Sequence, residues 1–567
     1  MSWRMIPARA SLGSPLNAVV IPLPRVPLWS QCLLLALLVG GVFSSVLGFE
    51  FLRWDDDIAV TQNALIQGEL SGELISGWFQ SDQAMRFKPV HWLAGWLLHQ
   101  QFGLNPAAWH ALNLILHVAV AVGFFLLLRQ ILSRWTTGGS ASAITVVAWL
   151  AAAGWALHPL RVEPVAWVTA STYPMATGWL VLSFALYLRA HPPGAAPAGR
   201  GWLIGSWLTA VLAYGTYPVT VTYGLFLVIV DWGGLKCIPR WRTAEFWRWL
   251  VKIAAFLVPA VVALLATVWA RYFDVGIFVA APDLASVALS ERVLMGLAGV
   301  GALAGRLIWW FDLTPNVPPM ESLLSNVLGL VALAVGVVVV SVVSWRNRTQ
   351  RPRSAVVWFG FIALALPCLG LTERATWPVD RYSYLGHLVL MAGLAGAGVQ
   401  SCRKPRLRIG VAMAAGVVVL GLASKRQLPM WADSRAFFTA LTEHPSFGED
   451  VRQDGHVLLL WSRYEAGEGH VDRLNELREQ ALQTYLAGIR NALNEADYAE
   501  AVELMSHIEH HFAVTAAMQR EKAAWLLELG RCAEAEHALA VSLHMKPDDE
   551  RALDLLRSVR ASQADTP

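Results

Sequence analysis

Long apolar runs separated by short polar segments recur along the first three quarters of the sequence. A run of about 20 apolar residues can cross the hydrocarbon core of a bilayer as a helix. The first run, residues 28–49, follows Arg4, Arg9 and Arg25 and contains no small-residue cleavage site, which predicts an uncleaved signal anchor with a cytoplasmic N-terminus. Further spans are expected at residues 106–128, 141–157, 165–188, 202–214, 219–230, 253–269, 322–343, 356–371, 384–399 and 409–423.

Two other apolar stretches are not expected to cross the membrane. Residues 92–102 are rich in Trp and Leu but are too short for a span, which is typical of a helix that lies along the membrane surface. Residues 293–311 precede a basic cluster at 346–353 that should be cytoplasmic. That placement requires residues 293–311 to be surface-lying or re-entrant. The chain then has eleven spans, with its N-terminus inside and its C-terminus outside.

From residue 425 the composition becomes soluble and helical, and a repeat is present. Leu493, Ala496, Glu500 and Ala501 recur 34 residues later as Leu527, Gly530, Glu534 and Ala535, and Pro547 follows the second unit. This period is typical of tetratricopeptide (TPR) repeats, with residues 447–482 as a degenerate third unit. An unrelated helical bundle is the alternative. We therefore expect an all-α protein with a cytoplasmic tail (1–27), a transmembrane domain (28–424) that contains an outer loop (49–105), and a TPR-like domain (425–567).

Composition supports the membrane assignment. Of the 567 residues, 56% are hydrophobic and 15% are charged, which excludes a single soluble domain. The net charge of +3 is small and the basic residues form short clusters between apolar runs, so no nucleic-acid partner is indicated. The five cysteines are scattered without paired spacing, which argues against a disulfide framework or a thiolate metal site.

Charged side chains and imidazoles of the outer loops carry the candidate chemistry. Asp55, Asp56 and Asp57 follow the first span, and holding them ionised together is costly because like charges raise one another's pKa. A solvated acidic loop that marks a helix end would give the same pattern. The expected topology places one set of residues on the same membrane face: Asp55, Asp56, Arg86, Lys88, His91, His158, Arg161, Glu163, Glu373, Arg374, Asp380 and Arg381.

Cations beside carboxylates at a bilayer surface suit a lipid phosphate, which Arg binds bidentately and Lys binds as a point charge. A carboxylate there can act as general base on a sugar or protein hydroxyl, with the lipid phosphate as leaving group. The alternative for Arg86, Lys88 and Arg381 is that they only extend toward lipid head groups.

One helix face of the second span carries three polar residues, His110, Asn113 and His117. Polar groups inside a membrane must face protein or water, so structural hydrogen bonding is the favoured role, with substrate contact as the alternative. A zinc site built from His91, His110, His117 and His158 has the right ligand type but no recognised spacing.

Several short motifs occur in an order that resembles a known family. They are Trp54-Asp55-Asp56 with Asn63, Phe87-Lys88-Pro89, Phe102-Gly103-Leu104-Asn105-Pro106, His110, Asn113, His117, His158-Pro159-Leu160-Arg161-Val162-Glu163 and Asp380-Arg381-Tyr382-Ser383-Tyr384-Leu385. Their order is similar to that of the GT-C membrane glycosyltransferases, above all the transmembrane and TPR repeat-containing O-mannosyltransferases and their bacterial relatives. The resemblance covers the chain after about residue 30.

The resemblance implies an inverting transfer from a polyprenyl-phosphate sugar to a hydroxyl of a protein or glycan. It implies that Asp55 is the base, that Asp56 positions acceptor or donor, and that Asp57 is solvated. It also implies that Arg381 and Lys88 hold the lipid phosphate while Glu163 and His158 line the pocket. The other candidate substrate-binding residues are Arg86, His91, Arg161 and Tyr382. No cofactor and no metal ligand is assigned, and metal dependence stays open.

Two positions depart from the family pattern. Ser171-Thr172-Tyr173 stands where the family often has Arg-x-Asp, and Gly215-Thr216-Tyr217 stands where it often has Ser-Lys-Glu. A non-catalytic TPR scaffold or polyprenyl-sugar binding protein is therefore an alternative. A lipid-linked sugar transporter is a further alternative, although the helices show no internal duplication.

The expected setting is a bacterial inner membrane, with the active site and the C-terminal domain in the periplasm. The expected partners are a lipid-linked sugar donor, a protein or glycan acceptor, and any protein that the repeats recruit.

Overall fold

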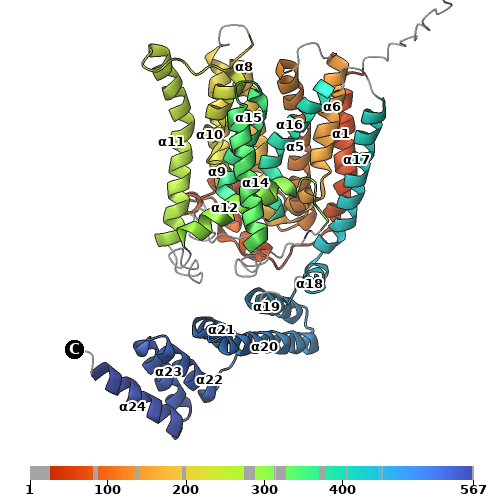
Figure 1. Ribbon diagram of the computed structural model, residues 1–567. Coiled ribbons are helices and arrows are strands. Elements are labelled where there is room, and N and C mark those ends of the chain that lie inside the picture. Colours follow the sequence, from red (N-terminus) through yellow and green to blue (C-terminus); the bar gives the residue numbers. More distant parts are fainter. Residues whose placement is uncertain are drawn as a thin grey trace, which may run out of the picture.

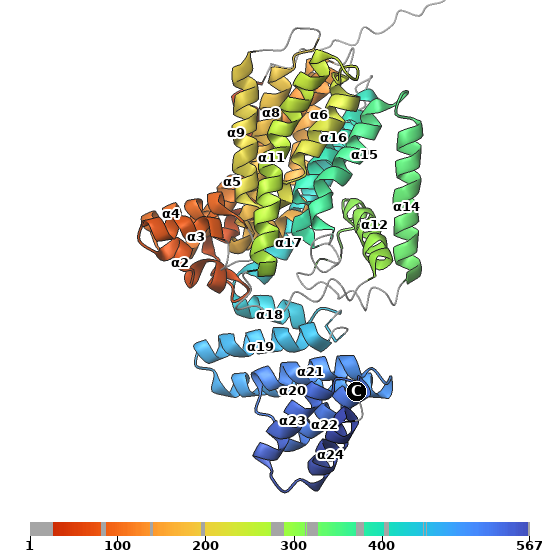
Figure 2. The same cartoon turned by 90° about the vertical axis from the view of Figure 1, so that its left-hand side faces the viewer.

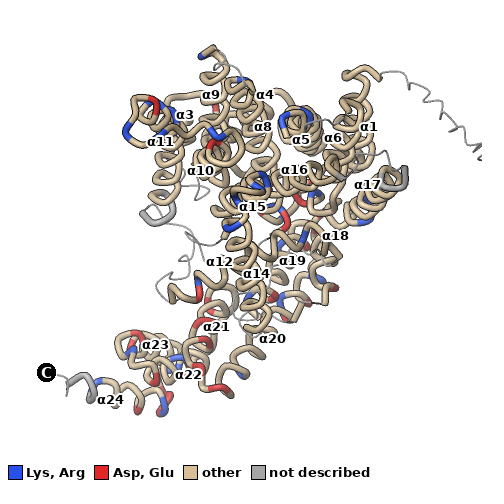
Figure 3. The backbone as a smooth tube through the Cα atoms, turned by 45° about the horizontal axis from the view of Figure 1, so that its top comes forward, with Lys and Arg blue, Asp and Glu red and all other residues tan. Residues whose placement is uncertain are grey.

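A computed structural model describes residues 26–80, 87–135, 140–193, 199–273, 288–311, 313, 327–369, 379–401, 407–445, 447–448 and 451–564. Within these ranges every regular element is a helix. Roughly parallel helices form a bundle, and a smaller set of helices lies beyond one end of it (Figure 1). Charged residues are sparse along the bundle helices and frequent in the C-terminal helices (Figure 3).

The bundle supplies the membrane-spanning part of the chain. Its helices are α1 (Leu28–Phe43), α5 (Pro106–Trp135), α6 (Ala141–Ala156), α8 (Thr172–Ala190), α9 (Arg200–Thr216), α10 (Tyr223–Ile229), α11 (Ala244–Phe273), α14 (Val327–Arg346), α15 (Pro352–Ala365), α16 (Ser383–Ser401) and α17 (Leu407–Gln427). Large apolar side chains on their outer faces are exposed, as Leu265 and Leu328 illustrate. Hydrocarbon can cover such a surface and water cannot do so at low cost.

Seven segments of the described chain are long and apolar enough to cross a membrane. They are Leu28–Gly48, Pro106–Trp135, Pro218–Leu235, Ala244–Trp269, Val327–Arg346, Asp380–Gln400 and Gly410–Trp431. An eighth results if Ala141–Ala156 and Pro159–Ala166, which meet at a bend of 63°, form one span. The protein is thus an all-α polytopic membrane protein with seven or eight candidate spans by length and composition, and the eleven spans expected from the sequence stay a prediction.

Several predicted boundaries move in the structure. The span predicted at 165–188 begins as a helix only at Thr172, because Pro159 and Pro164 break the preceding segment into short helical turns, Pro159–Arg161 and α7 (Val162–Ala166). The seventh predicted span starts earlier, at Ala244, so Arg248 and Lys252 belong to α11. The predicted surface-lying or re-entrant run becomes α12 (Leu289–Gly305), which packs beside α14 and is not among the candidate spans.

The predicted outer loop folds into a small helical lobe beside the bundle (Figure 2). It contains α2 (Ala64–Gln67), α3 (Gly72–Gln80) and α4 (Pro89–Phe102), the helix expected at residues 92–102. Ile66, Trp78 and Trp92 form its apolar core, and the Trp78 indole donates to the Leu65 carbonyl at 2.8 Å. This lobe is therefore a structured element rather than a polar loop.

The two ends of the bundle differ. The domain end holds the first residues of α5, α8 and α16 and the last residues of α17, and it leads to the C-terminal helices. The far end holds the last residues of α5 and α8 and the first residues of α15. All the candidate residues that the structure describes lie in segments at the domain end.

The C-terminal helices stack in chain order. They are α18 (Ser434–Thr442), α19 (Val451–Gly467), α20 (Val471–Asn494), α21 (Tyr498–His511), α22 (Ala516–Glu528), α23 (Cys532–Met545) and α24 (Glu550–Ala564). From α19 onward each helix packs chiefly on its neighbours along the chain.

The 34-residue sequence repeat is also a repeat of structure. Asp497 donates its backbone N–H to the Ala492 carbonyl at 2.8 Å, and 34 residues later Arg531 donates to the Leu526 carbonyl at 2.9 Å. The preceding residue is left-handed in both places, with φ of 58° at Ala496 and 71° at Gly530. Two equivalent helix ends thus support a solenoid of helix pairs, while its assignment to the TPR family stays a prediction.

Candidate functional site

The acidic loop follows the first span, and its three aspartates differ in environment. Asp56 is fully buried: its Oδ2 accepts from the Leu52 backbone N–H at 2.9 Å. Its Oδ1 accepts from the backbone N–H and the hydroxyl of Thr169, at 2.9 and 2.6 Å. Asp55 is exposed and Asp57 is half-buried. Asp56 therefore fastens the loop, and Asp55 is the carboxylate that a substrate can reach.

The buried carboxyl of Asp56 has an altered acidity. Burial raises the pKa of Asp56 to about 7, against the opposing effect of its three hydrogen bonds, and Asp55 adds a small upward contribution. Asp55 itself adopts a left-handed backbone with φ of 73°, which is costly for a residue with a Cβ.

Trp167 joins the acidic loop to the cationic side of the site. Its indole N–H donates to the Trp54 carbonyl at 3.0 Å. The guanidinium of Arg381 lies over its ring, 5.2 Å from the centroid. One side chain thus contacts both the peptide that leads into Asp55 and the Arg predicted to bind phosphate, although these residues are more than 300 positions apart in sequence.

Arg381 and Glu163 form a buried ion pair. The guanidinium binds one carboxylate oxygen of Glu163, and the Arg381 backbone N–H donates to the other at 2.9 Å. The Glu163 side chain is 3% exposed whereas that of Arg381 is 23% exposed. Part of the Arg381 side chain is therefore accessible from outside while Glu163 holds it in place.

Arg161 lies deeper in the bundle and is fully buried. It donates to the Ser383 hydroxyl at 2.8 Å and contacts His387 Nδ1 at 3.2 Å, while its Nε and Nη1 have no hydrogen-bond partner. Its guanidinium lies over the rings of Trp155 and Tyr384, at 5.2 and 5.3 Å. Arg161 is thus a second cationic side chain. It is more deeply buried than Arg381 and packs on the aromatic rings of Trp155 and Tyr384.

The two histidines near Arg161 hold the end of α12. His158 Nε2 lies 3.2 Å from the Leu307 carbonyl, and His387 Nε2 lies 2.7 Å from the Leu303 carbonyl. Arg306 forms an ion pair with Asp380, which precedes Arg381. These contacts fasten α12 against the start of α16, so they have a structural role at the site.

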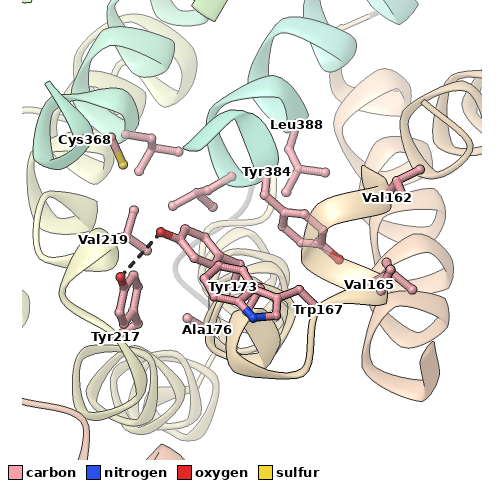
Figure 4. Close-up of a cluster of buried hydrophobic side chains, with 14 of the residues drawn as sticks. Val162, Val165, Trp167, Tyr173, Ala176, Tyr217, Val219, Cys368, Tyr384 and Leu388 are labelled. Carbon is pink, nitrogen blue, oxygen red and sulfur yellow. Dashed lines mark hydrogen bonds between the residues drawn. The ribbon is translucent and has the colours of Figure 1, made fainter. Parts of the chain in front are cut away.

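Two buried tyrosines, Tyr173 and Tyr217, meet inside the bundle (Figure 4). The Tyr173 hydroxyl donates to that of Tyr217 at 3.4 Å, and their ring centroids are 5.0 Å apart. The ring centroid of Tyr382 lies 6.4 Å from that of Tyr173. Tyr173 and Tyr217 occupy the two positions that depart from the family pattern, so the two departures belong to one contact.

Lys88 and His91 belong to the lobe. Lys88 precedes α4, is 6% exposed and places its ammonium 4.0 Å from the centroid of Trp92. Burial, with a contribution from Lys88, holds the pKa of His91 well below 6.5. Gly215 faces Val90 so closely that a Cβ would lie 2.8 Å from it, which places the start of α4 beside the chain that leads to Tyr217. Arg86, Glu373 and Arg374 lie outside the described residues.

The polar face of α5 has the structural role favoured from sequence. Asn113 donates to the Trp167 carbonyl at 2.8 Å, and His110 Nε2 lies 3.2 Å from the Glu50 carbonyl. His117 contacts the Tyr384 hydroxyl at 2.7 Å and the Ala156 carbonyl at 3.0 Å. Among the described residues, no three His, Cys, Asp or Glu side chains lie close enough together to hold a metal ion.

Sequence reasoning did not identify Trp167 and Thr169 as parts of the site. Both follow the His-Pro motif within a short stretch that looked like the start of a span. Their residue types and spacing do not indicate a functional site, because their roles arise only where this stretch contacts the acidic loop.

Comparison with known proteins gives one structural likeness. No family model matches the chain, and no curated protein matches it. The chain is similar to the crystal structure of ArnT from Cupriavidus metallidurans bound to undecaprenyl phosphate, with 17% identity over 81% of this chain and 75% of that chain. The TM-score is 0.36, which is too low to establish a common fold.

Proposed function

We propose that the protein is a glycosyltransferase that moves a sugar from a polyprenyl phosphate to a hydroxyl of a protein or glycan. One observation carries the proposal: an exposed carboxylate, Asp55, and a partly exposed guanidinium, Arg381, are connected through Trp167 at one end of a membrane bundle. A carboxylate near a cation can serve acid–base chemistry on a phosphorylated substrate.

Arg381 binds the lipid phosphate in this proposal. Glu163 orients its guanidinium, and a phosphate that approaches the accessible part adds a second anionic partner. Arg161 adds positive charge from the interior, and Lys88 contributes from the start of α4. Positive charge at the edge of a low-dielectric bundle stabilises the lipid phosphate as it departs.

Asp55 removes the proton from the acceptor hydroxyl. The acceptor oxygen forms a bond to the anomeric carbon as the bond from that carbon to the phosphate oxygen breaks. The lipid phosphate leaves with the electron pair, and attack from the opposite face inverts the anomeric configuration. Asp56, fixed by Leu52 and Thr169, holds the base in position, while His158, His91 and Tyr382 shape the surroundings of the pocket.

We further propose the eleven-span topology. The acidic loop touches the C-terminal helices, because Arg53 donates its backbone N–H to the Ser434 hydroxyl at 2.9 Å. Both therefore lie on the same side of the membrane, and the chain crosses an even number of times between them. Ten bundle helices, α5, α6, α8 to α11 and α14 to α17, meet this requirement. We place that side in the periplasm of a bacterium.

The test of function is transfer from a panel of polyprenyl-phosphate sugars, read as released polyprenyl phosphate. We expect Asp55→Asn to lose at least about a hundredfold of the rate, the usual contribution of a general base, while membrane insertion and the gel-filtration profile stay unchanged. Asp57→Asn is the matched control and should keep most of the activity. Equal activity of Asp55→Asn and the parent protein would remove the base assignment.

A scaffold is the second candidate, and a groove in the C-terminal helices favours it. The groove has a volume of about 1000 Å³ between α18, α19 and α20, and Trp461, Arg473 and Phe447 line it. The region around Ala535 is less suitable for partner binding because Ala535 is fully buried. A scaffold would be indifferent to Asp55→Asn, so the transfer assay separates the two candidates.

A further inference from the structure

A second cavity lies inside the bundle toward its far end. It has a volume of about 610 Å³, within the usual range of ligand pockets. Apolar side chains form most of its wall, among them Phe124, Leu180, Phe226, Val356 and Leu388. The helices that supply these side chains pack against one another around the cavity: α5 on α8, α10 on α15, α15 on α16 and α16 on α5.

The charged residues that line this cavity are all basic and all lie at the far end. They are Arg134 at the end of α5, Lys236 after α10, and Arg353 at the start of α15. Among the described lining residues none is Asp or Glu. The cavity is therefore amphipathic, with an apolar interior and a cationic mouth.

The positive charge at the mouth is not neutralised within the described chain. Arg134 donates to the carbonyls of His191 and Leu188 and has no carboxylate partner there. The side chains of Arg353 and Lys236 make no hydrogen bond or ion pair with another described residue, and Lys236 is held only through its backbone N–H, which donates to the Asp231 carbonyl. By contrast, the nearby Lys252 is paired with the buried Asp231 at 2.8 Å. An anion is the chemical complement that the mouth lacks.

We propose that this cavity is a binding site for an anionic glycerophospholipid of the leaflet at the far end. One acyl chain fills the apolar interior, and the head-group phosphate lies among Arg134, Lys236 and Arg353. Filling the cavity restores dispersion contacts that its wall would otherwise lack. Basic side chains near a membrane surface add a preference for anionic head groups.

The sugar donor of the proposed reaction is a different lipid. Its phosphate would lie at Arg381, at the domain end, whereas the unpaired cations of this cavity lie at the far end. A single head group cannot occupy both places. The proposal therefore does not depend on the proposed function.

The test is photolabelling of the full-length protein in vesicles. The probe is phosphatidylglycerol with a diazirine near the end of one acyl chain, and phosphatidylcholine with the same chain is the comparison. We expect phosphatidylglycerol to label peptides that contain Leu388, Val356 or Phe226 in preference to phosphatidylcholine. The double variant Lys236→Gln with Arg353→Gln should reduce this labelling roughly thirtyfold, as the loss of two basic residues predicts.

A matched pair of basic residues supplies the control. Arg240 and Arg242 lie between the same two helices as Lys236 but do not line the cavity, and Arg242, like Lys236, has a left-handed backbone. Arg240→Gln with Arg242→Gln removes the same charge and should leave the labelling unchanged.

Three results would overturn the proposal. They are equal labelling by the two phospholipids, labelling confined to exposed residues of α11 such as Leu265, or labelling of the cavity by a photoactivatable polyprenyl phosphate alone. The last result would assign the cavity to the donor chain instead.

Discussion

Arg381 and Glu163 show how a single pair of side chains can serve both stability and binding. Glu163 is nearly inaccessible, so its charge depends on Arg381 for compensation. Removing one partner of a buried pair leaves the other charge uncompensated, which costs more than the pair contributes while intact. Arg381 is thus a cation that is fixed at the site by the carboxylate of Glu163.

We expect Arg381→Gln to lower the stability of the bundle by about 3 kcal/mol, because it leaves the buried Glu163 unpaired. The measurement is the thermal unfolding temperature in detergent. Glu245→Gln is the control, because it removes one partner of an exposed ion pair on α11, with Arg248. It should change the free energy of unfolding by less than about 1 kcal/mol. An Arg381→Gln effect as small as the Glu245→Gln effect would contradict the buried pair.

Asp56 makes stability depend on pH. Its folded pKa, about 7, lies above the usual 3.8, so its contribution is fully present below about pH 4 and is lost as the pH rises through 7. The full effect is on the order of 4 kcal/mol. We expect the unfolding temperature to fall between pH 5 and pH 8 more steeply in the parent protein than in Asp56→Asn. Parallel curves would show that Asp56 ionises in the same way folded and unfolded.

The residues that sequence reasoning brought together were those with a charge and a motif around them. Asp55, Glu163 and Arg381 are polar residues beside apolar runs, so their placement at one membrane face followed from topology alone. Trp167 and Thr169 carry no such signal. Their contacts depend on how distant segments cross, which hydropathy does not encode.

At the scale of elements, helix ends define both halves of the molecule. In the bundle, Pro159 and Pro164 convert a predicted loop into short turns that place Arg161 and Glu163 beside the start of α16. In the C-terminal helices, equivalent left-handed residues end α20 and α22. Short breaks in helices thus position the site and set the period of the repeat.

The two equivalent helix ends differ in one respect that can be tested. Ala496 has a left-handed backbone with a Cβ, whereas Gly530 has the same conformation without one. We expect Ala496→Gly to stabilise the C-terminal helices by about 1 kcal/mol, since it removes the steric cost of that conformation. Protection of peptides 471–564 from limited proteolysis is the measurement.

The converse change should have the opposite sign. Gly530→Ala adds a Cβ that meets no atom within 4 Å, so only backbone strain opposes it. We expect a loss of about 1 kcal/mol. Loss of stability on Ala496→Gly would instead indicate that the helix end differs from that at Gly530.

On the scale of the whole molecule, the C-terminal helices contact the acidic loop. Trp54 packs on Phe437 with ring centroids 5.3 Å apart, and Glu50 donates its backbone N–H to the Ala432 carbonyl at 2.9 Å. Phe438 in turn stacks on Trp461, which lines the groove. The acidic loop therefore lies between the bundle and the repeat helices.

The proposed topology predicts the side of each connection. Reporters inserted at residue 140, before α6, and at residue 200, before α9, should lie on the opposite side of the membrane from one at residue 445. The measurement is accessibility of each site to an impermeant thiol reagent after cysteine substitution. A reporter at residue 140 on the same side as residue 445 would show that α5 or a later helix does not cross.

Most of the fold followed from the sequence because lipid imposes a simple rule on it. Apolar runs of sufficient length become helices, and each expected span has a helical counterpart. The predictions were weaker where crossing and merely packing look alike in composition, as in α8, α9 and α12. The helical lobe at 64–102 was missed because its core, built around Trp78 and Trp92, is small and irregular in sequence.

The aromatic layer of Trp155 and Tyr384 has a consequence for what the bundle can bind. Arg161 lies against its rings, and Phe124, which contacts Trp155, lines the cavity inside the bundle. Polar chemistry thus reaches deep into the bundle from the domain end, yet it meets close-packed rings before the cavity begins. Among the described residues the aromatic layer therefore separates the buried charge of Arg161 from the apolar wall of the cavity, so the polar site and the apolar cavity can serve different ligands within one bundle.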